Sequence, residues 1–167
     1  QYVSPKDAGL YLSSEYGNAN VLPESYENLK NLANMDGIII FPGFFGYSKT
    51  GDIVTFSRGG SDITGSILAA AVNADLYENF TDVDCVYSAN PNIIPNPNPI
   101  EEITYKEMRE LSYAGFSVFH EEALVPVYQR DIPVRIKNTN NPDAPGTTII
   151  PFHRSVKFPV IGVAGDT

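Results

Sequence analysis

The feature that most constrains this chain is a short polar turn between two apolar segments of different character. Residues 53–56 are mostly apolar and β-branched or aromatic, whereas residues 63–74 are rich in Ala, Ile and Leu and contain no proline. The sequence therefore predicts a strand followed by a helix. The turn between them consists of Arg58, Gly59, Gly60, Ser61 and Asp62, and we call it the 58–62 turn. Because Ser61 and Asp62 are good N-cap residues, we expect the helix to begin directly after them.

The 58–62 turn has the chemistry of an anion-binding site. A helix N-terminus presents unpaired N–H groups and a partial positive charge, and two glycines let a ligand approach the backbone closely. Arg58 can bind a carboxylate or a phosphate through two parallel hydrogen bonds, while Ser61 and Asp62 could hold an ammonium group beside it. Together these features suit a free amino acid. The alternative is a capped helix after a tight turn with a solvated Arg58, and the five residues alone do not separate the two interpretations.

Four further segments accompany the turn. They are residues 42–46 (Pro-Gly-Phe-Phe-Gly), 81–84 (Thr-Asp-Val-Asp), 102–108 (Glu-Ile-Thr-Tyr-Lys-Glu-Met) and 115–120 (Gly-Phe-Ser-Val-Phe-His). In this order and spacing, the segments and the turn resemble the second half of the catalytic domain of aspartokinases. The resemblance implies a three-layer αβα amino-acid-kinase fold, of which this chain is the nucleotide-side half. The alternation of apolar runs with helical stretches independently favours an α/β fold.

The resemblance also implies a reaction. ATP would transfer a phosphoryl group to the side-chain carboxylate of L-aspartate, giving 4-phospho-L-aspartate and ADP, with Mg²⁺ bridging the phosphates. This is the first step toward lysine, threonine and methionine. By residue match, Arg58 would hold the α-carboxylate, while Gly59 and Gly60 would allow the close approach. Ser61 and Asp62 would help to place the amino acid.

The nucleotide is expected to bind after the next strand. In the family the loop that contains Thr81 and Asp82 meets the nucleotide, and Tyr87 matches a tyrosine that lies along it. From the residues alone, Asp82 would be read as a turn-forming residue. Two positions depart from the family pattern, because Asn92 and Ser117 stand where many aspartokinases have an arginine and a lysine that face the phosphates.

The chain does not contain the Lys-Phe-Gly-Gly phosphate-binding motif with which aspartokinases begin. We therefore expect it to be a fragment that is inactive by itself. Residues 1–150 are assigned to the C-terminal half of the catalytic domain. Residues 151–167 are assigned to a linker and the start of an ACT regulatory domain, whose first strand residues 160–165 resemble. The intact enzyme is expected to be a homodimer.

Three alternatives to an aspartate kinase stay open. One is another amino-acid kinase that acts on glutamate, acetylglutamate or a nucleoside monophosphate, since aspartate and glutamate differ by one methylene group. The second is a ligand-binding or assembly module without catalysis. The third is a degenerate kinase, which is suggested by Asn92 and Ser117 at positions where many family members have a cation.

Charge and cysteine content limit the partners and the compartment. The formal net charge is -9 and no basic stripe is present, which argues against nucleic acid and anionic membranes as partners. The single cysteine, Cys85, cannot form an internal disulfide and fits a reducing compartment, so we expect a cytoplasmic protein. No apolar run approaches the roughly 18 residues of a membrane span.

The N-terminal part predicts a helix, a strand and a loop. The helix is expected from Pro23, in the first helical position, to Gly37 in the C′ position. Residues 38–41 form a continuous apolar run (Ile-Ile-Ile-Phe), which is typical of a strand buried on both faces. Phe44 and Phe45, in the loop that follows, are expected in the core.

The remaining elements are expected as follows. Residues 49–52 form a hairpin turn, and residues 76–80 form a strand. Thr104 has the spacing of a capping box and should start a helix. Residues 133–138 and 146–150 form strands, and the second resembles the closing edge strand of the family.

The two histidines are not expected in the chemistry. A substrate carboxylate is already ionised at neutral pH, so phosphoryl transfer to it needs no general base. His120 is therefore predicted to be structural. His153 lies in the C-terminal tail, where the sequence indicates no site around it.

Overall fold

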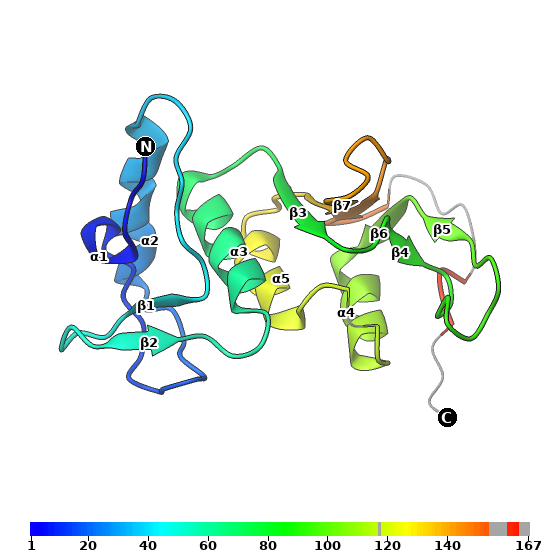
Figure 1. Cartoon of the computed structure of the whole chain (residues 1–167), viewed down its shortest axis with the longest axis horizontal. Coiled ribbons are helices and arrows are strands. Elements are labelled where there is room, and N and C mark those ends of the chain that lie inside the picture. Colours follow the sequence, from blue (N-terminus) through cyan, green and yellow to red (C-terminus); the bar gives the residue numbers. More distant parts are fainter. Residues whose placement is uncertain (117, 154–159, 164–167) are drawn as a thin grey trace.

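The computed structural model describes residues 1–116, 118–153 and 160–163. Its helices are α1 (Pro5–Ala8), α2 (Glu24–Leu29), the 3₁₀ helix η1 (Lys30–Asn34), α3 (Gly60–Val72), α4 (Tyr105–Tyr113) and α5 (Glu121–Tyr128). Its strands are β1 (Phe45–Tyr47), β2 (Ile53–Thr55), β3 (Tyr77–Thr81), β4 (Val86–Tyr87), β5 (Pro99–Ile100), β6 (Glu102–Thr104), β7 (Val134–Asn138) and β8 (Thr147–Ile150). Figure 1 shows the N-terminal elements at one end of an elongated molecule, α3 and α5 in the middle, and α4 toward the other end. No helix in the described ranges is long and apolar enough to cross a membrane.

The largest sheet has four strands in the order β3-β7-β8-β6. β3 pairs with β7 in parallel, with Tyr77 opposite Val134 and Thr81 opposite Asn138. β7 pairs antiparallel with β8, and β8 pairs parallel with β6. The strands expected at residues 76–80, 133–138 and 146–150 are thus confirmed. The expectation that the last of them closes the sheet was wrong, because β6, too short to be recognised in the sequence, pairs beyond β8.

Three helices pack on this sheet and on one another, as expected of an α/β chain. α3 contacts β3, α4 contacts β6 and β8, and α5 contacts both α3 and α4. The interior between these elements is apolar, and its fully buried side chains include Ile67, Met108, Val127, Ile136 and Ile149. Burial of a side chain of this size contributes roughly 1.5–3 kcal/mol, so the α3–α5–sheet core holds the middle of the molecule together.

Helix α3 begins earlier than its sequence predicts. Gly59 is the N-cap residue, in a left-handed conformation with φ 78°, and the helix starts at Gly60. Ser61 and Asp62 are therefore inside the first turn, and their assignment as N-cap residues was wrong. Glycine adopts the left-handed backbone without the Cβ penalty of other residues. Gly59 can therefore be the N-cap residue, and the helix begins at Gly60, one residue before Ser61. Asp62 is still in the first turn of α3, where its negative charge interacts favourably with the helix dipole.

The N-terminal helix is shorter than expected. α2 starts at Glu24, so Pro23 is its N-cap residue and not its first helical residue as predicted. The helix continues only as the 3₁₀ turn η1, which ends at Asn34. Gly37 has a left-handed φ of 84°, yet it stands beyond the C-cap residue Met35, so its C′ assignment was wrong. A 3₁₀ turn at a helix end tightens the last turn and terminates it without a glycine.

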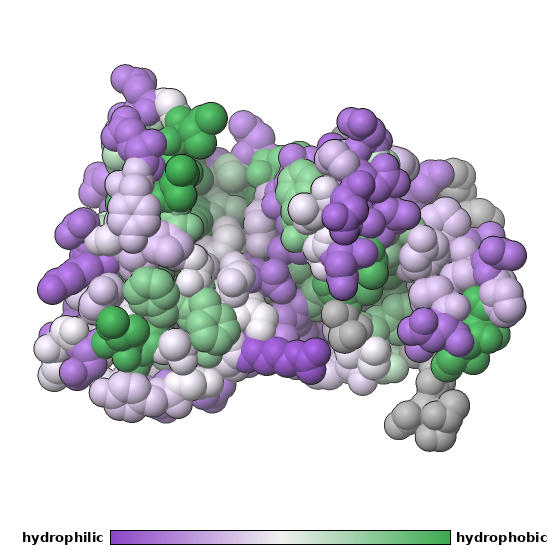
Figure 2. Space-filling view, in the orientation of Figure 1, coloured by the Kyte–Doolittle hydropathy of each residue, from purple (hydrophilic) through white to green (hydrophobic). Residues whose placement is uncertain are grey.

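The apolar run at residues 38–41 is not a buried strand. Ile38 is 84% exposed and Ile40 is 63% exposed, and its main-chain pairing is a parallel bridge between Ile40 and Tyr2. Figure 2 shows apolar side chains gathered at the surface over this segment, beside the N-terminal helices. Ile39 and Phe41 are partly buried against the core. The expectation of burial on both faces was therefore wrong, because the described residues cover only one face of the run and leave Ile38 and Ile40 exposed.

The hairpin prediction is confirmed, and the core assignment of the two phenylalanines is not. β1 and β2 pair antiparallel around the turn at residues 48–52. Phe44 is 45% exposed and has a left-handed φ of 81°, while Phe45 is half-buried. The side chain of Phe44 lies against the 58–62 turn and not in the interior, as described below.

The turn before β8 requires a glycine, and this requirement can be tested. Gly146 has φ 73°, and a Cβ there would lie 2.0 Å from the main-chain oxygen of Ile136 in β7. We expect Gly146→Ala to lower the free energy of unfolding by roughly 2–4 kcal/mol, because strain and a backbone clash add. Gly17→Ala is the matched control: φ is 77° but nothing lies within 4 Å, so the loss should be about 1 kcal/mol. Equal losses in urea unfolding would contradict the proposed clash.

Candidate functional site

The 58–62 turn lies at the start of α3 with its arginine facing solvent. Arg58 is exposed and forms no ion pair within the described part of the chain. Gly60 is buried, and a Cβ at this position would lie 2.6 Å from Cδ2 of Phe44 and 3.0 Å from Cβ of Phe56. The turn thus needs a residue without a side chain at position 60, while Arg58 remains available to a ligand.

The loop at residues 42–46 packs on the turn. A Cβ at Gly43 would lie 3.3 Å from Cα of Ser61. The Phe44 N–H donates to Oγ1 of Thr64 at 3.0 Å, and this hydroxyl donates to the Gly60 carbonyl at 2.8 Å. The structure therefore brings the loop and the turn together. The unfavourable φ of Phe44 is held by these contacts, and backbone strain of this kind is often found at functional sites.

Asp62 faces the neighbouring strand. Its Oδ1 accepts a hydrogen bond from Nδ2 of Asn79 at 2.8 Å, and its main-chain oxygen accepts one from the Tyr77 hydroxyl at 3.2 Å. Burial raises the pKa of Tyr77 to about 12, opposed by the hydrogen bond from Asn79 and reinforced by the Asp62 carboxylate. The phenol is therefore neutral and can donate at physiological pH. One oxygen of Asp62 is thus occupied within the protein, and a role toward a ligand ammonium stays a prediction.

Thr81 and Asp82 lie at the carboxyl end of β3, the end toward which the start of α3 is directed. Asp62 of α3 meets Asn79 of β3, and Gly65 of α3 lies against Tyr77, so the helix and the strand run in opposite directions. Residues 79 and 81 share one face of the strand and are about 7 Å apart along it. The residues before Asp62 therefore lie toward Thr81, which supports one continuous surface. Oγ1 of Thr81 donates to Oδ1 of Asp82 at 3.2 Å, and Asp82 is exposed.

Tyr87 belongs to a different part of the fold. It lies on β4, opposite Pro99 of β5, and no hydrogen bond or ring contact of the described residues joins it to Thr81 or Asp82. The Cys85 thiol beside it raises the pKa of the Tyr87 phenol. Closer to the strand ends, Oδ1 of Asp84 accepts a hydrogen bond from Nδ2 of Asn138 at 2.8 Å. Asp84 therefore ties the loop after β3 to the end of β7, a contact that the sequence did not reveal.

Two hollows of the described residues lie beside α4. One hollow lies between α4 and α5, where Arg109 and Tyr128 contribute to its wall. A second lies beside α4 and includes Glu107 and Gly162. Neither is lined by the 58–62 turn or by the end of β3.

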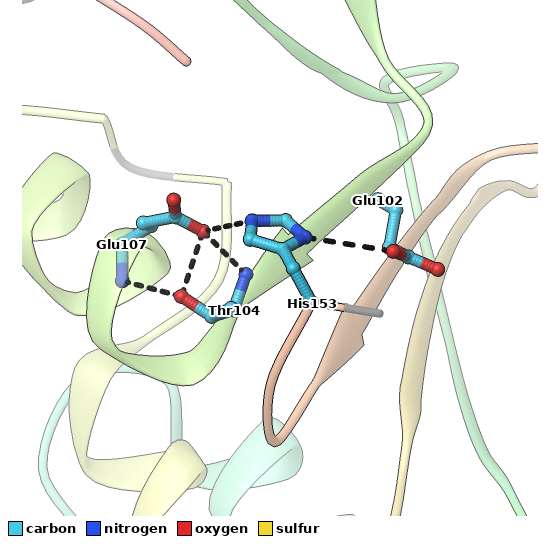
Figure 3. Close-up of polar contacts among 4 residues, drawn as sticks. All are labelled: Glu102, Thr104, Glu107 and His153. Carbon is cyan, nitrogen blue, oxygen red and sulfur yellow. Dashed lines mark hydrogen bonds and ion pairs between the residues drawn. The ribbon is translucent and has the colours of Figure 1, made fainter. Parts of the chain in front are cut away.

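A histidine cluster that the sequence analysis missed lies on α4. His153 is 17% exposed in its side chain, with Nε2 2.8 Å from Oε2 of Glu107 and Nδ1 3.5 Å from Oε1 of Glu102. Figure 3 shows the imidazole between the two carboxylates. The same Glu107 oxygen accepts hydrogen bonds from the N–H and hydroxyl of Thr104 at 2.8 and 2.7 Å. The predicted capping box is confirmed. His153, around which the sequence indicated no site, contacts two carboxylates, and its lack of a functional role stays a prediction.

The capping box could be read from a three-residue spacing, whereas the histidine contact spans 46 residues and has no local sequence signal. The cluster does not form a metal site. The described ranges contain no group of three or more His, Cys, Asp and Glu side chains that could hold a metal ion. The contacts of His153 therefore attach the chain after β8 to the start of α4.

The Glu107 cluster predicts a pH-dependent contribution to stability. Burial would raise the pKa of Glu107, but the two hydrogen bonds from Thr104 and the contact with His153 outweigh it and lower the pKa below its ordinary value of 4.5. A carboxylate with a lowered folded pKa stabilises above its unfolded pKa, and this contribution is lost as the pH falls through the folded value. We expect Glu107→Gln to cost about 0.5–1 kcal/mol at about pH 7, and the difference from wild type to vanish at about pH 3.

Urea unfolding at the two pH values measures this effect. The control is Glu110→Gln on the same helix, where the carboxylate is 63% exposed and 3.7 Å from Arg109. This variant should change stability little at either pH. A loss in Glu107→Gln that is the same at both pH values would show that the charge of Glu107 is not responsible.

Comparison with known proteins gives one family and several relatives. The family described as "Amino acid kinase family" matches residues 1–138. Aspartokinase 3 of Bacillus subtilis (strain 168) is 65% identical over 167 residues, which are 100% of this chain and 37% of that protein. The chain thus spans well under half the length of this relative.

Two solved structures are similar to the fold described above. The aspartate kinase of Clostridium acetobutylicum shares 44% identity with a TM-score of 0.85, over 98% of this chain and 37% of that one. Aspartokinase III of E. coli, solved in complex with aspartate and ADP, shares 28% identity with a TM-score of 0.81, over 93% of this chain and 35% of that one.

Proposed function

The chain belongs to the amino acid kinase family, and on this premise we propose that it is part of an aspartokinase. The intact enzyme would transfer the γ-phosphoryl group of ATP to the side-chain carboxylate of L-aspartate and release 4-phospho-L-aspartate and ADP. The observation that carries the proposal is 65% identity to an aspartokinase along all 167 residues. The exposed Arg58, which forms no ion pair among the described residues, and the start of α3 beside it support the proposal independently.

In this proposal residues 1–150 are the C-terminal half of the catalytic domain, and residues 151–167 are a linker and the beginning of an ACT domain. Of the second assignment, residues 154–159 and 164–167 lie outside the described residues. Residues 160–163 contain no helix or strand, and the Val163 N–H donates to the Ser88 carbonyl at 2.8 Å. The exposed Ile38 and Ile40 fit a chain in which other residues of a longer enzyme cover this segment. We propose that the intact enzyme is a homodimer. We expect residues 1–167 alone to be inactive.

The aspartate would bind at the 58–62 turn. The first N–H groups of α3 have no partner within the helix and carry its positive dipole end. Arg58, exposed and unpaired in the described structure, would hold the α-carboxylate through two hydrogen bonds. Gly59 and Gly60 leave the backbone accessible, and Ser61 adds an exposed hydroxyl. Asp62 would act mainly by fixing the turn to β3, since one of its oxygens accepts from Asn79.

The nucleotide would bind along Thr81, Asp82 and Tyr87. Thr81 is the last residue of β3 and Asp82 follows it, and α/β folds bind ligands beyond the carboxyl ends of their strands. E. coli aspartokinase III holds aspartate and ADP in its solved complex, which supports a nucleotide beside the amino acid here. Asn92, at a position where many aspartokinases have a cation, is exposed with its N–H bonded to Asn90, and Ser117 lies outside the described residues.

We assign no residue of this chain to Mg²⁺. The described ranges hold no cluster of three or more side chains suited to a metal ion, and Asp82 is a single exposed carboxylate. The work of this chain is therefore to bind and orient. The substrate carboxylate is ionised and attacks without a base, so alignment of aspartate and ATP on one surface supplies most of the contribution that these residues can make.

Loss of the arginine side chain should weaken aspartate binding. In the intact enzyme, we expect Arg58→Ala to raise the Kd for L-aspartate about 10–150-fold, because a charge-assisted hydrogen bond contributes roughly 1.5–3 kcal/mol. Calorimetric titration with L-aspartate, L-glutamate and UMP measures the effect. Arg109→Ala, an exposed arginine on α4, is the control and should leave the Kd unchanged. Tighter binding of glutamate or UMP would assign the chain to another amino acid kinase.

The nucleotide assignment makes a separate prediction. Asp82→Ala should raise the KM for ATP, roughly tenfold for the loss of about 1.4 kcal/mol, and leave the KM for aspartate unchanged. Initial rates at varied ATP and varied aspartate separate the two constants. If only the aspartate kinetics changed, the division into an aspartate site at the turn and a nucleotide site after β3 would be wrong.

A further inference from the structure

Both neighbours of Arg58 in the chain contact the start of α5. On one side, Oγ of Ser57 donates a hydrogen bond to Oε2 of Glu122 at 2.8 Å. On the other side, a Cβ at Gly59 would lie 2.6 Å from Cβ and 2.7 Å from Cγ of His120, so the imidazole covers the glycine. Residues about 60 positions further along the chain therefore hold the backbone immediately before and after the arginine.

The side chain of His120 does not cap helix α5, although the residue stands at the N-cap position. His120 is the N-cap residue of α5, but its side chain forms no capping hydrogen bond. Its Nδ1 is buried and has no hydrogen-bond partner among the described residues. A buried unpaired nitrogen costs free energy, and such groups in native structures call for an explanation. We relate this one to the contact of the His120 side chain with Gly59, which packs it against the turn.

The same segment also reaches the far end of the turn. Phe119 is 2% exposed, and its ring centroid lies 6.2 Å from that of Tyr77. The Tyr77 hydroxyl donates to the main-chain oxygen of Asp62. Residues 119–122 therefore support the 58–62 turn at Ser57, at Gly59 and, through Tyr77, at Asp62. Because α5 packs along α3 through buried side chains, this support is rigid.

We propose that the start of α5 is a clamp that positions Arg58 for the substrate carboxylate, with His120 and Glu122 as its positioning residues. This inference rests on the proposed aspartate site, and neither residue contacts the substrate in it. Fixing the backbone on both sides of the arginine removes conformational freedom before the ligand arrives. Less entropy is then lost on binding, so the clamp raises affinity for aspartate and leaves the chemistry of phosphoryl transfer unchanged.

The test removes the clamp without removing the arginine. In the intact enzyme, Ser57→Ala, Glu122→Ala and His120→Ala should each raise the KM for aspartate roughly 5–30-fold, with kcat and the KM for ATP unchanged. Ser57→Ala is the smallest change and guards against misfolding in the His120 variant. Glu27→Gln, an exposed glutamate on α2, is the charge-matched control and should have no effect.

A double-mutant cycle separates positioning from a general loss of stability. If the clamp acts through Arg58, then Glu122→Ala should add no further loss of aspartate affinity when Arg58→Ala is already present. Independent losses that add, or an unchanged KM for aspartate in Ser57→Ala and Glu122→Ala, would overturn the proposal.

Hydrogen exchange provides a readout that does not depend on the reaction. The amides of residues 57–62 should exchange faster in Glu122→Ala than in wild type, whereas those in the middle of α3 should not change. If the wild-type enzyme showed no aspartate binding or turnover, the proposed function would fail, and faster exchange would still establish the clamp on the turn. Unchanged exchange would overturn it.

Discussion

The antiparallel packing of α3 on β3 determines how the 58–62 turn lies relative to Thr81 and Asp82. Asp62 is joined to Asn79 by a 2.8 Å hydrogen bond, and position 65 must be glycine because a Cβ there would lie 2.5 Å from the Tyr77 hydroxyl. Together these contacts set the helix beside the strand with its N-terminus toward the strand's carboxyl end. The dipole of α3, Arg58 and the loop after β3 can then act on one ligand surface, as in other α/β folds.

The same packing gives structural roles to residues in and around the turn. In the sequence Asp62 looks like a ligand group, but in the fold it also anchors the helix to the sheet. Phe44 looks like a core residue, but its ring lies over Gly60 and forces that position to remain a glycine. Binding sites are commonly supported in this way, because side chains around the site hold its backbone in place.

At the far end of the molecule, His153 performs a similar structural task between segments. Its ring joins the chain after β8 to the carboxylates of Glu102 and Glu107, and Glu107 also caps α4. A movement of His153 would therefore alter its contact with Glu107 at the start of α4. This helix packs on β6, β8 and α5.

The sequence by itself determined the family, the α/β class, the hairpin, the capping box of α4 and the strands β3, β7 and β8, because turns, caps and apolar runs depend on residues close together in the chain. The family comparison confirms that class, while the roles of Arg58 and Asp82 stay predictions. Only the tertiary structure decided the exposure of residues 38–41, the true start of α3, and the contacts of His120 and His153. Each depends on segments that are distant in sequence, or on a covering layer, and no local pattern records which of them will meet.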